Sequence, residues 1–211
     1  MKSIVIVGAG GFGREVLQYL KDIHGSDPVK GFLDDNLTSV EPASLEQRIL
    51  GRISDYAPQP DEEFVLAIGN PGLRLRLANQ LTERGARFIS VIHPLAYVAS
   101  SATLGTGCII APFAPIGANA VLSDQVVVTF YASVAHDAVV GPASALSPHS
   151  VANGGSRLGT ASFLGTAAVV NPTCSVGNFA KVAAGSVVYR DVPDRSLASG
   201  NPAKSRPLLG D

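Results

Sequence analysis

The chain has 211 residues, enough for one or two domains with a proper hydrophobic core. Its 16 Lys and Arg residues nearly balance 17 Asp and Glu residues, and the formal net charge is -1. With no basic cluster in the sequence, this balance argues against a nucleic-acid-binding surface. No stretch approaches the roughly 20 apolar residues of a membrane span, and the chain opens directly into a strand pattern rather than a signal peptide, so we expect a cytoplasmic protein.

The first ninety residues alternate between strand and helix patterns. Short apolar runs at 4–7, 29–33 and 64–68 predict strands, while the segment after the first run and residues 73–84 carry helical periodicity. Strands that alternate with helices favour a small parallel sheet, about half of a Rossmann fold. We therefore predict an α/β N-terminal domain over residues 1–91.

A glycine-rich segment follows the first predicted strand. Gly8, Gly10 and Gly13 match the pattern G-x-G-x-x-G, and the acidic pair Asp34 and Asp35 follows about twenty residues later. Glycines allow the backbone to approach a diphosphate, whose charge is stabilised by N–H groups at a helix N-terminus. The second half of the fold that a nicotinamide dinucleotide requires is missing, so the pattern favours a nucleotide diphosphate. The alternative is a tight turn that binds nothing.

Residues 92–190 repeat with a period of six. Every sixth residue from Ile92 to Val188 is aliphatic, with Ala152 as the smallest, and a small side chain follows four positions later in almost every repeat. Neither an α-helix nor a simple strand has this period, whereas a parallel β-helix that turns a corner every six residues does. Three strands, or eighteen residues, would close one triangular coil, and residues 191–211 would form a C-terminal tail. The faces carry few charges, which favours side-by-side packing of identical subunits.

Several motifs together carry a family resemblance. Beside the glycine-rich segment and the hexapeptide repeat stand F-L-D-D (32–35), A-I-G-N (67–70), V-I-H-P (91–94), A-H-D (135–137) and D-V-P-D-R-S-L-A-S-G-N-P-A-K (191–204). Over essentially the whole chain this set resembles the hexapeptide-repeat sugar O/N-acyltransferase family, whose members acetylate nucleotide-linked 4-amino sugars or sialic acids. The resemblance implies a left-handed parallel β-helix, acetyl-CoA as cosubstrate, no metal, and a homotrimer with its active site between subunits.

The same resemblance assigns roles to residues of the repeat. His136 would be the general base and Asp137 would orient its imidazole ring. Gly154, eighteen residues after His136, would donate its backbone N–H to the thioester carbonyl; the alternative is that this glycine only relieves crowding. Thr166 and Ala184 would line the pantetheine track, with Gly154 and Thr166 above the base in the intersubunit groove. The candidate nucleotide-sugar contacts are Gly8, Gly10, Gly11, Phe12, Gly13, Asp34, Asp35, Gly69 and Asn70.

The sequence departs from the family pattern at two positions. Phe12 stands in the glycine-rich segment where many members carry histidine, and Ala145 stands where some members carry a second histidine, nine residues after the catalytic one. These changes affect the prediction of the sugar that accepts the acetyl group more than the prediction of the reaction itself. His149 could substitute near CoA or simply occupy a corner of the coil. Lys204 and Arg206 could contact the CoA phosphates or be solvated charges of the tail.

The sequence thus predicts an acetyl-CoA-dependent N-acetyltransferase that acts on a nucleotide-diphosphate-linked 4-amino-4,6-dideoxy sugar. O-acetylation of a sialic acid type sugar is one alternative, and a non-catalytic scaffold that binds nucleotide sugars is another. Cys108 and Cys174 both occupy the small inward position of a repeat, on different sides of the triangle. We expect them to be buried thiols without a disulfide or metal.

Overall fold

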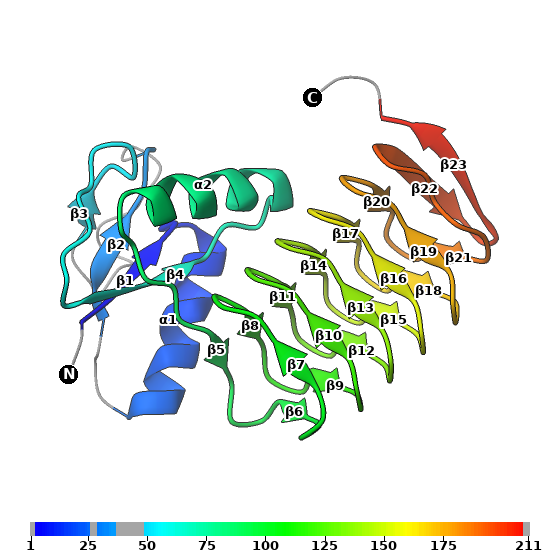
Figure 1. Cartoon of the computed structure of the whole chain (residues 1–211), viewed down its shortest axis with the longest axis horizontal. Coiled ribbons are helices and arrows are strands. Elements are labelled where there is room, and N and C mark those ends of the chain that lie inside the picture. The colour runs from blue at the N-terminus through cyan, green and yellow to red at the C-terminus, as the bar shows by residue number, and fades with distance from the viewer. Residues whose placement is uncertain (1–2, 26–28, 37–48, 209–211) are drawn as a thin grey trace.

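The computed structural model describes residues 3–25, 29–36 and 49–208. The chain first forms a compact α/β unit and then a long triangular coil (Figure 1). The α/β unit contains β1 (Ser3–Val7), α1 (Gly11–His24), β2 (Val29–Leu33), β3 (Ile49–Gly51), β4 (Glu62–Leu66) and α2 (Pro71–Glu83). Its four strands are parallel and lie in the order β3-β2-β1-β4.

The half-Rossmann expectation is confirmed, with differences at element ends. The predicted third strand lies two residues earlier, at Glu62–Leu66, and α2 begins at Pro71, because Asn70 caps the helix by accepting a hydrogen bond from the Leu73 amide at 3.0 Å. The three-residue strand β3 at the sheet edge was not predicted. Its apolar run is only two residues long, Ile49 and Leu50, and all three of its residues are only partly buried.

Seventeen two-residue strands, β5 to β21, form a left-handed parallel β-helix, as the hexapeptide period predicts. The docked face, named for the α/β unit that packs on it, contains β5 (Val91–Ile92), β8 (Ile109–Ile110), β11 (Val127–Val128), β14 (Ala145–Leu146), β17 (Phe163–Leu164) and β20 (Lys181–Val182). The second face contains β6 (Tyr97–Val98), β9 (Pro115–Ile116), β12 (Ser133–Val134), β15 (Val151–Ala152), β18 (Val169–Val170) and β21 (Val187–Val188). The third face contains β7 (Thr103–Leu104), β10 (Val121–Leu122), β13 (Val139–Val140), β16 (Arg157–Leu158) and β19 (Ser175–Val176).

The repeat explains both the core and the corners. The aliphatic residue of each repeat points inward and is buried from Ile110 onward, whereas Ile92 remains 40% exposed because no coil lies beneath it. At most corners a residue takes the left-handed backbone conformation, including non-glycine residues such as Asp137 with φ 57° and His149 with φ 61°. Corner residues eighteen positions apart therefore stack directly above one another.

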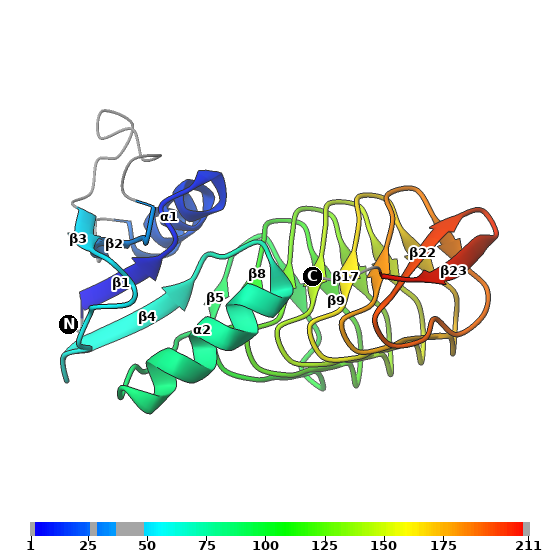
Figure 2. The ribbon, with the colours of Figure 1, turned by 90° about the horizontal axis from the view of Figure 1, so that it is seen from above.

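The α/β unit packs on the lower coils of the docked face (Figures 1 and 2). Outward side chains of this face, such as Val127 and Ala145, join one apolar cluster with Val16 and Tyr19 of α1. Arg74 of α2 secures the same junction. At 0% exposure, its guanidinium donates to the backbone carbonyls of Gln125 at 3.0 Å and Ala143 at 2.7 Å.

An antiparallel hairpin caps the far end of the β-helix. Strand β22 (Ser196–Gly200) continues the docked face beside β20, and β23 (Ala203–Pro207) pairs with β22. In the described residues neither helix has the length and hydropathy needed to cross a bilayer. Cys108 is buried and Cys174 is partly exposed, and both are free thiols on different faces.

Candidate active site

His136 and Asp137 lie at the corner between the second and third faces, which we call the histidine edge. The imidazole Nδ1 lies 2.8 Å from Asp137 Oδ2, and the two side chains are 70% and 57% exposed. If Nδ1 carries the proton and donates it to the carboxylate, Nε2 is left with a lone pair directed away from Asp137. Hydrogen bonds from His136 first and Asn119 second hold the pKa of the Asp137 carboxyl below its usual value. The pair can therefore accept a proton at Nε2 while the carboxylate stays ionised.

Asn119, which the sequence did not predict as a site residue, supports the carboxylate of Asp137. Its side-chain Nδ2 donates to Asp137 Oδ1 at 3.2 Å, and its backbone N–H donates to Ser101 Oγ at 3.1 Å. Ser101, Asn119 and Asp137 are each eighteen residues apart, so they form one column along the edge. Subtracting one coil from Asp137 would have identified Asn119 from the sequence alone.

Gly154 lies directly above the imidazole of His136. A Cβ at this position would come within 2.6 Å of Cε1 and 2.7 Å of Nε2 of the ring. Glycine therefore leaves room for the imidazole in this position, whereas a larger residue would displace the exposed ring. Within the described part of the chain the Gly154 amide donates no hydrogen bond, although its carbonyl accepts one from the Thr173 amide at 3.1 Å. A backbone N–H without a partner is available to polarise a carbonyl oxygen of a ligand.

Thr166 and Ala184 lie on a different edge. They follow β17 and β20, so they stand at the corner between the docked and second faces, whereas His136 and Gly154 stand at the corner between the second and third. Within one chain Thr166 is therefore not above His136. The five candidate residues of the repeat form two separate groups on the two edges that border the second face.

An aromatic ladder occupies the lower part of the edge that carries Thr166. Phe113, Tyr131 and His149 stack in nearly parallel planes, with ring centroids 5.1 Å and 5.0 Å apart. The ladder stops at His149, because the next residue in the column is Ala167. We call this corner the aromatic edge.

The glycines of the N-terminal loop fall into two classes. Gly8 has φ +103°, and a Cβ there would meet the carbonyl oxygen of Ala67 at 2.6 Å. A Cβ at Gly13 would clash with the carbonyl oxygen of Gly8. These two glycines are required by packing within the chain. A Cβ at Gly10 would have nothing within 4 Å, and at Gly11 only the flexible end of Arg14 at 4.0 Å. The open space over Gly10, at the N-terminus of α1, is where a phosphate could approach the backbone.

The predicted acidic and amide contacts of this domain also brace its loops. Asp34 accepts hydrogen bonds from the Ala9 amide at 2.8 Å and the Asn36 amide at 2.9 Å, one on each carboxylate oxygen. Asp35 accepts from the Ser54 amide at 3.2 Å, and Asn70 caps α2. Gly69 is exposed beside Asn70. The structure therefore gives a role in shaping the loops around the open glycines to Asp34, Asp35 and Asn70.

A cavity of about 140 Å³ lies between this loop and the docked face. Phe12 and Gly69 line it from the α/β unit, and Val127, Ala145 and Phe163 line it from the β-helix. Arg74 also borders it, and burial lowers the pKa of its guanidinium to about 10. No carboxylate forms an ion pair with Arg74 in the described ranges, so backbone carbonyls alone compensate its charge.

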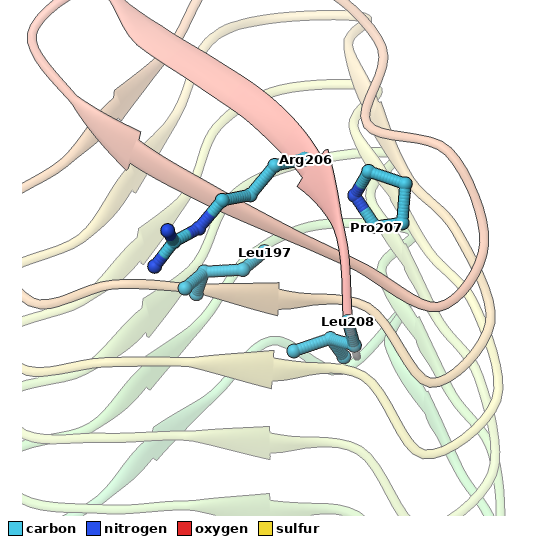
Figure 3. A pocket seen from close by; sticks show the side chains of 4 residues that line it. All are labelled: Leu197, Arg206, Pro207 and Leu208. Atoms are coloured by element: carbon cyan, nitrogen blue, oxygen red, sulfur yellow. The ribbon is translucent and has the colours of Figure 1, made fainter. Parts of the chain in front are cut away.

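A second cavity, of about 190 Å³, lies at the C-terminal hairpin (Figure 3). Leu197, Arg206, Pro207 and Leu208 line it. Arg206 extends beside Leu197 over this cavity, at the far end of the coil from the α/β unit. Residues 3–25, 29–36 and 49–208 contain no group of three or more His, Cys, Asp or Glu residues arranged to hold a metal ion.

Comparison with known proteins gives a consistent set of relatives. The family model described as the PglD N-terminal domain matches residues 3–81. A UDP-N-acetylbacillosamine N-acetyltransferase of Bacillus subtilis (strain 168) is 33% identical over 119 residues, which are 52% of this chain and 51% of that protein. The matched region thus spans about half the length of this curated relative.

Solved structures match over nearly the whole chain. PerB from Caulobacter crescentus, solved in complex with CoA and GDP-perosamine, is 33% identical, covers 97% of both chains and superposes with a TM-score of 0.88. The acetyltransferase domain of PglB from Neisseria gonorrhoeae FA1090, solved in complex with acetyl coenzyme A, is 29% identical and covers 97% of this chain and 99% of that one, with a TM-score of 0.85.

Proposed function

The chain belongs to the hexapeptide-repeat sugar acyltransferase family, and from this premise we propose that it transfers the acetyl group of acetyl-CoA to the amine of a nucleotide-diphosphate-linked 4-amino-4,6-dideoxy sugar. The stacking of Gly154 over His136 carries the proposal, since it puts a residue whose backbone N–H has no acceptor in the described residues one coil above the imidazole, on an exposed edge. A relative solved with CoA and GDP-perosamine supports both substrate classes. We propose that the enzyme works in the cytoplasm.

The proposed transfer is direct. The amine nitrogen attacks the thioester carbonyl carbon, the C–N bond forms, and the C–S bond breaks to release CoA as a thiolate. His136 Nε2 accepts the proton that the amine loses and returns it to the thiolate, while Asp137 stabilises the imidazolium that forms in between. The Gly154 N–H donates to the carbonyl oxygen as negative charge develops on it. No acyl-enzyme is needed.

We further propose that two chains share each active site. The α/β unit, with its open glycine loop, packs on the docked face. His136 lies on the edge between the other two faces, which is the corner of the triangle opposite the docked face. An acceptor held by the glycine loop is therefore separated from His136 of the same chain by the whole width of the coil. A neighbouring chain has to supply the missing half.

The second face is the best candidate for the surface between subunits in a homotrimer. The histidine edge and the aromatic edge both border it, and its outward strand residues carry no charge: Tyr97, Pro115, Ser133, Val151, Val169 and Val187. If this face lies toward a threefold axis, His136 and Gly154 of one chain meet Thr166 and Ala184 of the next. CoA would then lie in the groove between these two edges.

The reaction can be tested by following free thiol from acetyl-CoA in the presence of GDP-linked and UDP-linked 4-amino-4,6-dideoxy sugars. We expect thiol release together with an N-acetylated sugar nucleotide by mass spectrometry. Release only with free sialic acids would instead establish O-acetylation. Binding of sugar nucleotides without any release would favour the non-catalytic scaffold.

A further inference from the structure

Side-chain size changes abruptly along the aromatic edge. One exposed corner residue per coil stands in the same column: Phe113, Tyr131, His149, Ala167 and Gly185, in order from the lower coils to the upper ones. All five have a positive φ, between 56° and 67°, so they occupy equivalent corners. The lower three carry rings, whereas the upper two carry one side-chain carbon or none. The edge is therefore filled in its lower coils and open in its upper coils.

The neighbouring column of this edge changes at the same level. Phe130 and Pro148 stand in its lower coils, and the smaller Thr166 and Ala184 stand above them, both exposed. The backbone joins the two columns, since the Gly185 amide donates to the Thr166 carbonyl at 2.8 Å. The open part of the edge thus coincides with the proposed pantetheine track. The aromatic ladder begins directly below that track.

Stacking makes the ladder a firm stop at the lower end of the track. The ring planes of His149 and Tyr131 are 7° apart, and those of Tyr131 and Phe113 are 9° apart. The amide of His149 donates to the Phe130 carbonyl at 3.2 Å, which holds the corner that carries the top ring. A ring that swung aside would lose about 0.5–1.5 kcal/mol of stacking. His149 therefore ends the ladder as a supported ring, with no ring above it.

The top of the ladder lies level with the reacting groups. His149 and Gly154 belong to one coil, and Tyr131 and His136 belong to the coil below it. In a trimer whose threefold axis runs parallel to the coil, equivalent coils of all chains lie at the same height. A thioester that accepts a hydrogen bond from Gly154 of one chain then lies at the height of His149 of the next chain.

We propose that the aromatic ladder limits the length of the acyl group that the enzyme transfers, an inference that rests on the proposed function and its shared site. CoA would descend past Ala184 and Thr166, so acyl carbons beyond the thioester would continue downward, where His149 fills the space. An acetyl methyl group would end against this ring, and a longer chain would overlap it. The ladder acts through its volume, so the polar atoms of Tyr131 and His149 take no part in the selection.

The first test compares acetyl-CoA, propionyl-CoA and butyryl-CoA with the amino-sugar acceptor that gives the fastest thiol release. For the wild type we expect kcat/KM to fall by roughly 10- to 200-fold from acetyl to propionyl, which is the range that one methylene group commands in a closed pocket. Butyryl-CoA should be used still less.

Variants along the ladder should relax this preference in a graded way. His149→Ala removes the top ring and should raise the use of propionyl-CoA relative to acetyl-CoA by about tenfold or more. Tyr131→Ala removes only the support of that ring and should give a smaller increase. Phe113→Ala, two coils below the thioester, should leave the ratio close to that of the wild type.

His149→Phe is the matched variant that separates volume from acid–base chemistry. It keeps a ring at the top of the ladder but carries no nitrogen, so the preference for acetyl-CoA should persist. A phenylalanine variant as permissive as His149→Ala would overturn the inference, because the imidazole nitrogens would then matter and the volume would not.

Mixing subunits tests whether the ladder acts on the neighbouring chain. Wild-type protein is exchanged with a large excess of chains that carry both His136→Ala and His149→Ala. Almost every intact His136 then faces a ladder without its top ring, so the remaining activity should show the relaxed ratio of His149→Ala. The same excess of His136→Ala chains is the control and should preserve the wild-type ratio.

Three further results would contradict the inference. They are a wild type that uses propionyl-CoA as well as acetyl-CoA, an unchanged ratio in folded His149→Ala protein, and a wild-type ratio in the mixture with the double variant. Circular dichroism establishes the fold of each variant, and mass spectrometry establishes the mixed oligomers. Absence of thiol release from every acyl-CoA in the wild type is a different result, which would overturn the proposed function itself.

Discussion

The histidine edge and the docked face hold the two halves of the proposed chemistry, and they are built in opposite ways. On the docked face a mostly apolar cavity lies between the two parts of one chain, beside the buried Arg74 that joins them. On the histidine edge the side chain of His136 is 70% exposed, with Asp137 as its hydrogen-bond partner and Gly154 stacked above it. A preformed half and an uncovered half are what a site shared between subunits requires, since only assembly can cover the second.

Removing the base should give the largest effect on turnover. His136→Ala should lower kcat by roughly 10² to 10⁴, with little change in acetyl-CoA affinity or in the melting temperature, because the side chain lies outside the core. Steady-state kinetics and calorimetry measure the two quantities. Asp137→Asn should cost less, since an amide still contacts the ring but stabilises its charge poorly. Full activity of His136→Ala at all pH values would show that another group takes the proton.

Arg74 should contribute more to the stability of the protein than any residue of the histidine edge, because it joins the α/β unit to the docked face. Arg74→Met leaves backbone carbonyls in the domain junction unpaired, which should lower the free energy of unfolding by about 3–5 kcal/mol. Arg84→Met is the control, because the exposed Arg84 also donates to two carbonyls, those of Ile53 and Ser54, but within the α/β unit. It should cost about 1 kcal/mol or less. If denaturant titrations showed equal losses in the free energy of unfolding for both variants, Arg74 would contribute no more to stability than an exposed arginine does.

The open glycine separates acceptor binding from acetyl-CoA binding. Gly10→Val would fill space that no chain atom occupies, so we expect affinity for the nucleotide sugar to fall by about tenfold or more while acetyl-CoA affinity is retained. Titration calorimetry with each ligand separates the two. A parallel loss for both ligands would indicate misfolding rather than a blocked phosphate site.

Asn119 should have the smallest effect, because it acts on His136 only through Asp137. Asn119→Ala removes one exposed hydrogen bond at 3.2 Å, so kcat should fall about two- to tenfold while the KM for both substrates stays the same. Asn119→Asp would place two carboxylates in contact and should lower kcat further. A change in KM with kcat preserved would assign Asn119 to substrate contact instead.

The features that the sequence predicted well are those that follow from the repeat of six residues. The period of six fixed the coil, its corners and the neighbours of His136, because residues eighteen apart must stack. The edge that carries Thr166 also follows from that arithmetic, since 166 and 154 differ by twelve. The cavity at Phe12 and Ala145 does not follow, because it depends on how the α/β unit packs on the docked face through Arg74, and no local pattern encodes that junction.

The most direct test of the shared site is to mix two impaired proteins at an acceptor concentration well below the wild-type KM, where each alone has little activity. His136→Ala keeps the glycine loop, and Gly10→Val keeps the histidine edge, so a site formed between one chain of each kind has both intact halves. After subunit exchange in an equal mixture, random assembly should restore about a quarter of the wild-type activity. A mixture that remains inactive, although mass spectrometry shows mixed oligomers, would contradict the shared site.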